Sequence, residues 1–192
     1  METIKGLFQK EKISAMVLAK AIAIVVSFAM LYYFITNGTP TLSYTFGTDG
    51  RLAIRFGNAL KALALWNPLS AMGLTTASFI MNYEKGRLFI GLYSFMALIT
   101  QAGMGYLVYW LNNRGTKSHS KTLLLLTVWS FISALGVALN HAIIANGWFG
   151  IDLVTMFKTT FFFQLPGQLI ATAVIGYPLY LAFNKVSEKF KK

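Results

Sequence analysis

The sequence contains no cysteine, which excludes disulfide bonds and thiolate metal sites. Acidic residues are also scarce, because six aspartates and glutamates stand against seventeen lysines and arginines in 192 residues. The two histidines, His119 and His141, lie in different segments. Paired carboxylates, a nucleophile beside a base, and metal ligands at helical spacing are therefore not recognisable. We expect no catalytic residue and no metal site, and we interpret the chain as a protein that is not an enzyme.

Charge is sparse as a whole, and apolar residues dominate. Only 12% of the residues are charged, whereas 56% are hydrophobic. A water-soluble domain of this size could not bury so much apolar material, so the composition indicates an integral membrane protein. The net charge of +11 is not gathered on a soluble basic face, and we expect no nucleic-acid partner.

The apolar segments predict the fold class. A spanning helix needs roughly 20 apolar residues, and two shorter apolar segments flank the "WNPLS" turn, where Pro68 suits a first helical turn. We predict an all-α integral membrane protein with six transmembrane helices, the second and third short, in a single membrane domain over residues 1–192. The predicted helices are Ile13–Ile35, Leu52–Trp66, Leu69–Tyr83, Leu88–Leu111, Leu123–Ala145 and Leu165–Phe183.

Six crossings place both termini on one side, and the basic residues indicate which side it is. The termini side would carry Lys5, Lys10, Lys12, Arg114, Lys117, Lys121, Lys185, Lys189, Lys191 and Lys192, and the opposite side Arg51, Arg55, Lys85, Arg87 and Lys158. Lys20 and Lys61 fall within helices. We therefore predict a multi-pass cell-membrane protein whose termini, residues 1–12 and the basic tail 184–192, are both cytoplasmic.

The predicted outer side carries the more specialised sequence. Residues 36–57 form a loop that is too polar to span and too rich in aromatics to be a plain linker, so we expect it to fold over the outer mouth. Polar side chains also interrupt the outer halves of the helices. Amides in lipid are costly unless they pair or line a cavity, so these groups either tie helices together or form a binding pocket.

Their concentration at one depth favours the pocket. The stretch "ALNHAIIANGWFG" is its strongest element, although an aromatic such as Trp148 is also typical of the membrane interface. We expect these substrate-binding residues: Tyr44, Arg55, Asn58, Asn82, Tyr83, Tyr93, Gln101, Asn140, His141, Trp148 and Gln164.

The first helix carries a stripe of small residues. Ala15, Ala19 and Ala23 are four residues apart and therefore lie on one face, where they would let another helix approach closely. Lys20 lies beside this stripe, within snorkelling reach of the cytoplasmic surface. The stripe either packs within the chain or serves as a docking face for a second protein.

These features together resemble a known family. Six helices, an A-x-x-x-A first helix, a structured outer loop, "RFGNALKALALWNPLSAMG" and a final "LPGQLIATAVIGYPLYLAF" helix are similar to the substrate-binding S component of energy-coupling factor (ECF) vitamin transporters. The resemblance covers most of the stretch from Ile13 to Lys185.

The resemblance implies the partners. Such a chain would bind a vitamin from outside in the lipid membrane, and it would dock through Ala15, Ala19 and Ala23 onto a transmembrane T subunit that carries two cytoplasmic ATPase subunits. ATP and Mg would be used only by those ATPases, and no cofactor is expected in this chain. The sequence agrees, since it has no Gly-rich loop with G-K-S/T.

The identity of the substrate is the property that the sequence indicates least directly. Cobalamin is the first expectation, because its amide-bearing rim would pair with an amide-rich pocket and cobalamin binders occur among S components. Riboflavin would stack on Tyr44, Phe46 or Trp148, whereas pantothenate and folate would need inward-facing arginines or lysines. The other classes considered are a small membrane enzyme or lipid assembly factor, and a structural subunit.

Overall fold

The computed structural model describes residues 15–38, 42–46, 50–54, 56–84 and 90–189, and for 15, 42–46, 50–54, 90 and 188 it describes the backbone only. The elements are α1 (Ala15–Gly38), β1 (Leu42–Phe46), β2 (Gly50–Ile54), the 3₁₀ helix η2 (Phe56–Leu65), α2 (Leu69–Glu84), α3 (Ile90–Ala97), the π helix η3 (Leu98–Gly103), α4 (Met104–Asn113), α5 (His119–Phe149), α6 (Leu153–Leu169), the π helix η4 (Ile170–Ile175) and α7 (Gly176–Lys189).

These elements make six helical passes. The segments α3, η3 and α4 follow one another without a break, as do α6, η4 and α7, so each set forms one pass with a π-helical stretch inside it. The other passes are α1, η2, α2 and α5. The predicted count of six helices is confirmed. Among the described residues, three helical stretches are long and apolar enough to cross a membrane, namely Met16–Gly38, His119–Phe149 and Leu153–Ser187.

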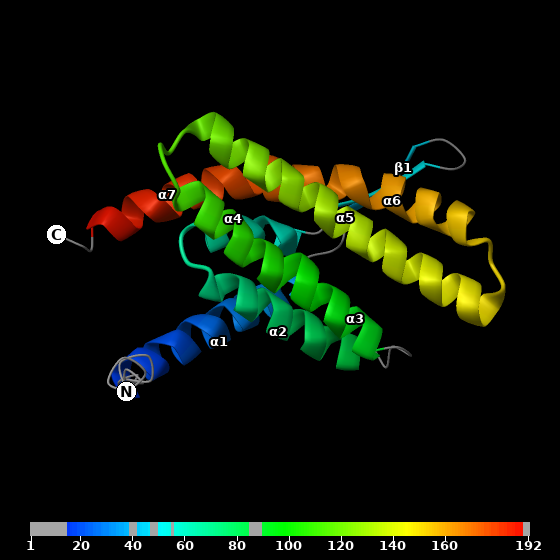
Figure 1. Ribbon diagram of the computed structural model, residues 1–192, viewed down its shortest axis with the longest axis horizontal. Coiled ribbons are helices and arrows are strands. Elements are labelled where there is room, and N and C mark those ends of the chain that lie inside the picture. The colour runs from blue at the N-terminus through cyan, green and yellow to red at the C-terminus, as the bar shows by residue number, and fades with distance from the viewer. Residues whose placement is uncertain (1–14, 39–41, 47–49, 55, 85–89, 190–192) are drawn as a thin grey trace, which may run out of the picture.

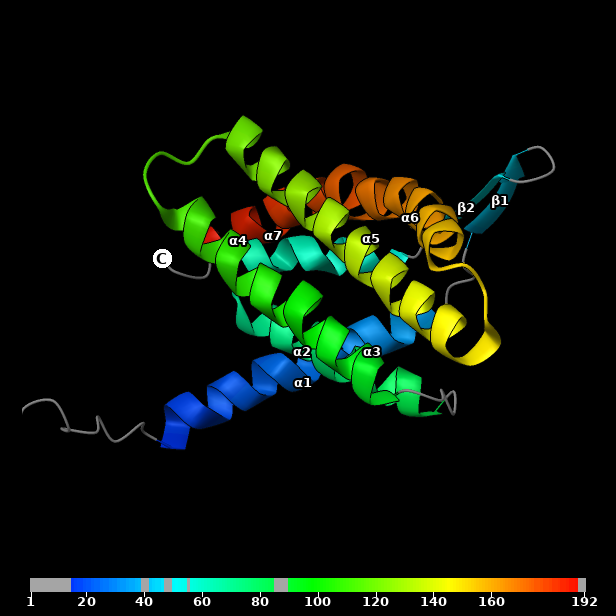
Figure 2. The same cartoon turned by 45° about the vertical axis from the view of Figure 1, so that its right-hand side comes forward.

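Successive passes run in alternating directions through the bundle. The start of α1, the end of α7 and the α4–α5 connection lie at one end, which we call the terminal end (Figure 1). The β-hairpin and the α5–α6 connection lie at the opposite end, which we call the hairpin end, and a second view shows the same arrangement (Figure 2). The antiparallel hairpin pairs Leu42 with Ile54 and Phe46 with Gly50, and β2 lies against α6.

Several predicted boundaries are wrong. The hairpin takes up the stretch from Leu52 to Ile54 that was assigned to the second helix, which begins only at Phe56. The last pass begins at Leu153 instead of Leu165, and α5 extends beyond its predicted Leu123–Ala145 at both ends. Helices continue past the apolar stretch because backbone hydrogen bonds and caps, and not hydropathy alone, decide where they end.

Of the two predicted terminal segments, the structure describes part of the C-terminal one. Helix α7 continues to Lys189, so the predicted tail from 184 onward is helical over that part. The predicted N-terminal segment 1–12 lies outside the described residues.

Helix η2 lies at the centre of the bundle. Every residue from Gly57 to Leu65 is buried, because α1, α2, α4 and α7 surround this short helix. Close approach of α1 to α2 depends on Gly73, where a Cβ atom would lie 2.6 Å from the backbone oxygen of Val25 and 2.7 Å from Phe28 Cβ. The bundle thus holds a short, fully surrounded helix that can carry polar groups inward.

The outer surface of the bundle is apolar. Large hydrophobic side chains are exposed along several passes, including Met16, Ile22, Phe34, Phe95 and Phe162. An apolar surface of this extent is typical of contact with lipid. It agrees with a multi-pass membrane protein.

Candidate functional site

A cavity of about 210 Å³ lies inside the half of the bundle nearer the hairpin end. Its wall is built from the second half of α1, the start of η2, the second half of α2, α3 with η3, the second half of α5, and α6. The lining residues are Tyr32, Thr36, Asn58, Lys61, Ser78, Met81, Asn82, Tyr93, Met96, Ala97, Thr100, Gln101, Ser133, Gly136, Val137, Asn140, His141, Gln164 and Gln168. Every helical pass contributes, so the site exists only in the assembled bundle.

Most of the residues expected from the sequence come together in this cavity. Those that line it are Asn58, Asn82, Tyr93, Gln101, Asn140, His141 and Gln164. Asn58, Asn140 and Gln164 are buried, and the Tyr93 ring meets the His141 ring edge to face at 6.0 Å between centroids. Polar side chains at one depth therefore share one cavity, and their role in binding is a proposal developed below.

Other expected residues are not brought there. Tyr83 is 71% exposed and Trp148 is 68% exposed, and neither lines the cavity. Tyr83 follows Asn82 on α2 and is therefore turned about 100° around the helix axis from it. Trp148 lies in the last turn of α5, where an aromatic ring is typical of a membrane interface. The side chain of Tyr44, in β1, and the whole of Arg55 lie outside the described residues.

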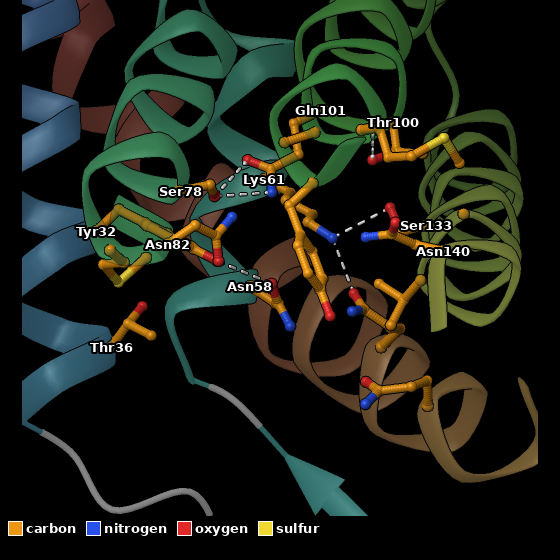
Figure 3. Close-up of a pocket in the computed structure, with 18 of the residues that line it drawn as sticks. Tyr32, Thr36, Asn58, Lys61, Ser78, Asn82, Thr100, Gln101, Ser133 and Asn140 are labelled. Carbon is orange, nitrogen blue, oxygen red and sulfur yellow. Dashed lines mark hydrogen bonds between the residues drawn. The ribbon is translucent and has the colours of Figure 1, made fainter. Parts of the chain in front are cut away.

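The charged residue of the described lining is Lys61, which sequence reasoning missed as a site residue. Lys61 is 2% exposed, and its Nζ donates to Ser133 Oγ at 3.1 Å and to Gln168 Oε1 at 2.8 Å (Figure 3). These contacts join η2 to α5 and α6. The signal was present, because an ionisable residue inside an apolar segment is by default a functional-site hypothesis.

Some of the polar groups tie helices together. Gln101 Nε2 donates to Ser78 Oγ at 3.0 Å, which joins η3 to α2, and Tyr32 Oη donates to Asn58 Oδ1 at 3.5 Å, which joins α1 to η2. For these residues the interpretation that polar groups tie helices together is confirmed. These pairs hold the helices of the cavity wall together.

Two other polar atoms of the cavity wall have no hydrogen-bond partner among the described residues. Among the described residues, Asn140 Oδ1 and Thr36 Oγ1 are buried and have no hydrogen-bond partner. Both residues line the cavity, and Asn140 is 3% exposed. A buried acceptor without a partner costs free energy, which a ligand donor would recover.

The π helix η3 sets the position of Thr100 and Gln101. A π helix shifts the residues that follow it around the helix axis and is frequent at functional sites. Helix α5 approaches η3 closely at Gly136, where a Cβ atom would lie 2.5 Å from Thr100 Cγ2. The π helix η3 and Gly136 together bring α5 and η3 to the same part of the cavity.

The chemistry available is that of binding. The described lining supplies amides, hydroxyls, an imidazole and an ammonium, and it contains no carboxylate. Within the described ranges, no group of three or more histidine, aspartate or glutamate residues could hold a metal ion. Such a wall offers a small ligand both hydrogen-bond donors and acceptors.

The small-residue stripe of α1 lies on the outside. Ala19 and Ala23 are exposed, and so is Lys20. The face of α1 that packs into the bundle carries Phe28, Ala29 and Tyr32 instead. The stripe is therefore not an internal packing face over the part described, and the side chain of Ala15 is outside that part.

Comparison with known proteins gives one family. The model of a family described as "QueT transporter" matches residues 12–185. Neither a curated protein nor a solved structure matches the chain.

Proposed function

The chain belongs to the QueT transporter family, whose members are ECF-type S components, and from this premise we propose that its cavity binds a queuosine precursor for uptake. The observation that carries the proposal is the polar cavity, buried inside a membrane bundle and lined by Asn58, Lys61, Asn140 and Gln164. A polar cavity in such a bundle is a site for a small polar ligand.

The size of the cavity supports a small ligand. Its volume of about 210 Å³ lies below the roughly 300–1,000 Å³ of pockets for drug-sized molecules. Queuosine is a deazaguanine nucleoside, so its precursor bases are flat and compact, with amide-like edges. Such a base is matched to a cavity of amides and hydroxyls.

Cobalamin, the first expectation from the sequence, loses its support. A corrin ring with its side chains is several times larger than the cavity, and the substrate of the QueT family is of a different kind from a vitamin. The argument from amides was sound in its chemistry, because it predicted a ligand with amide-like edges. It did not limit the size of that ligand, since a sequence does not give a volume.

The proposed transport cycle needs partner subunits. We propose that the ligand enters from the outside at the hairpin end, that both termini are cytoplasmic, and that a transmembrane T subunit with two ATPases supplies the energy. The exposure of Ala19 and Ala23 supports docking through α1, because small exposed residues allow close contact between helices in lipid.

The binding test uses the detergent-solubilised chain. Calorimetric titration with cyano-deazaguanine and aminomethyl-deazaguanine should give saturable heat, and Gln164→Ala should lower the affinity about tenfold, which corresponds to about 1.4 kcal/mol. Tyr83→Ala and Trp148→Ala serve as matched controls and should change affinity less than twofold, because neither side chain lines the cavity. Heat with cobalamin or riboflavin and none with either deazaguanine would overturn the substrate and leave the transporter assignment intact.

A further inference from the structure

We propose that Lys61 and Asn140 recognise the carbonyl and N–H edge of the ligand, and that this pair makes the cavity select bases with a ring carbonyl over bases with an amino group in its place. In this arrangement Lys61 Nζ donates to the ligand carbonyl oxygen and Asn140 Oδ1 accepts from a ligand N–H. The inference rests on the proposed function and adds to it the feature of the ligand that is read.

Lys61 presents a donor that is fixed in position. Its Nζ is held by Ser133 Oγ on α5 and by Gln168 Oε1 on α6, so the ammonium cannot follow the ligand as a surface lysine could. The described lining residues include no carboxylate. A carbonyl oxygen near this ammonium is attracted, whereas an amino group there would set donor against donor.

Asn140 presents the complementary acceptor. Its Oδ1 is buried with no partner among the described residues, and the side chain lines the same cavity as Lys61. A ligand N–H would satisfy this oxygen. A ligand that places a methyl group there would leave it buried and unsatisfied, which is costly in a low-dielectric site.

Lys61 and Asn140 face the same cavity, and Figure 3 shows Ser133, which accepts from Lys61, beside Asn140. Ser133, which holds Lys61, and Asn140 are seven residues apart on α5, so they share a face and lie about 10 Å apart along its axis. Side chains on a helix lean toward its N-terminus, which brings the Asn140 amide back toward the level of Lys61.

The ligand-side test uses the unmodified protein and does not depend on the folding of a variant. Affinities of the purified chain are compared for three bases. The first is deazaguanine, and the second is 2-amino-deazaadenine (hereafter deazaadenine), which has an amino group in place of the carbonyl and no hydrogen on the neighbouring ring nitrogen. The third is deazaguanine methylated on the ring N–H. We expect at least a hundredfold preference for deazaguanine over each of the other two bases, because a site built to bind a polar edge rejects analogues that lack it.

The protein-side test assigns the preference to the two residues. Lys61→Met keeps the unbranched stem and should reduce the preference over deazaadenine at least tenfold, mainly through weaker binding of deazaguanine. Asn140→Ala should bind deazaguanine and its methylated form with affinities within threefold of each other. Tyr83→Ala is the control and should retain both preferences.

The outcomes distinguish edge recognition by Lys61 and Asn140 from the proposed transport function. If the unmodified chain binds deazaguanine and deazaadenine equally, or if Lys61→Met keeps the full preference, edge recognition by this pair is overturned while the transporter function stands. If none of the deazapurines binds, the proposed function fails, and the edge recognition that rests on it fails too.

Discussion

Trp129 Nε1 donates a 2.7 Å hydrogen bond to the backbone carbonyl oxygen of Thr100. Thr100 lies in the π helix η3, and Trp129 lies in α5 and is completely buried. A π helix interrupts the regular ladder of backbone bonds, and the indole N–H supplies a partner at that point. The bond thus couples α5 to the segment that positions Thr100 and Gln101 in the cavity wall.

Removal of this bond should destabilise the protein. In Trp129→Phe a smaller phenyl ring replaces the fully buried indole, and the Thr100 carbonyl loses its hydrogen-bond partner, so the change should cost at least about 1–3 kcal/mol. Thermal unfolding in detergent, followed by intrinsic fluorescence or circular dichroism, measures the effect. Trp110→Phe is the control, because Trp110 is 47% exposed, and it should change the stability by less than about 0.5 kcal/mol. Equal midpoints for the two variants would contradict this role of Trp129.

Gly73 should not tolerate a methyl group. A Cβ atom there would meet the Val25 backbone oxygen at 2.6 Å, so Gly73→Ala should force α1 away from α2 and cost about 1–3 kcal/mol. Gly147→Ala is the matched control on α5, since a Cβ atom there has no neighbour within 4 Å. Helix propensity alone would make the control neutral or slightly stabilising. A midpoint for Gly73→Ala at or above that of the control would refute the close approach.

Much of the fold follows from hydrophobic runs. The apolar stretches that contain α1 and α5 are long enough to predict spanning helices. The amides Asn58, Asn140 and Gln164 could be recognised because polar groups are rare in such runs. These residues were predicted as site residues, and the structure places them in one cavity. Their spacing along single helices could not show which residues face each other across the bundle.

Other features were missed for identifiable reasons. The sequence "LSYTFGTDGRLAI" has two strand-like segments around a Gly- and Asp-containing turn, which is a hairpin signal, but it was interpreted as a folded loop and the start of a helix. The position of Lys61 in an apolar segment marked it as a candidate, but the sequence does not tell whether such a lysine is buried or reaches the surface, as Lys20 does. Only the packing of four helices around η2 makes Lys61 a buried group.

The exposed stripe on α1 should control association with the T subunit. Ala19→Phe places a bulky ring on a face that carries small residues, and it should reduce co-purification of the T subunit at least tenfold while ligand affinity stays within twofold. Val17→Phe is the control, because Val17 is exposed on α1 but lies outside the alanine stripe. Unchanged recovery of the T subunit with Ala19→Phe would show that docking uses another face.

Asp152 should make stability depend on acid pH. It caps α6, and the Thr155 backbone N–H, which donates to Asp152 Oδ2 at 2.7 Å, holds the pKa of this carboxyl below its ordinary value. A lowered folded-state pKa means that the stabilisation is present above the unfolded value of about 3.9 and is lost as the pH falls through the folded-state pKa.

The measurement compares the native chain with Asp152→Asn, which keeps a capping oxygen but does not titrate. The native thermal midpoint should fall relative to that of the variant as the pH is lowered from about 5 to about 3. A constant difference between the two midpoints over this range would show that the carboxylate contributes nothing through its charge.

Topology can be tested directly, because the chain has no cysteine. Thr116 is exposed in the α4–α5 connection at the terminal end, and Trp148 is exposed at the end of α5 near the hairpin end. In whole cells, an impermeant thiol reagent should label Trp148→Cys, and it should label Thr116→Cys only after lysis. The reverse pattern would invert the proposed orientation.

The central position of η2 has a consequence for how the protein is made. At about 2 Å per residue its ten residues extend only about 20 Å, short of the roughly 30 Å hydrocarbon core, and Lys61 adds a charge that costs about 2.5–3.5 kcal/mol at insertion. The translocon would not release such a segment into lipid by itself. Helix η2 therefore enters the bilayer only together with the neighbouring helices. The cavity is completed by tertiary folding within the membrane and not by the insertion of individual helices.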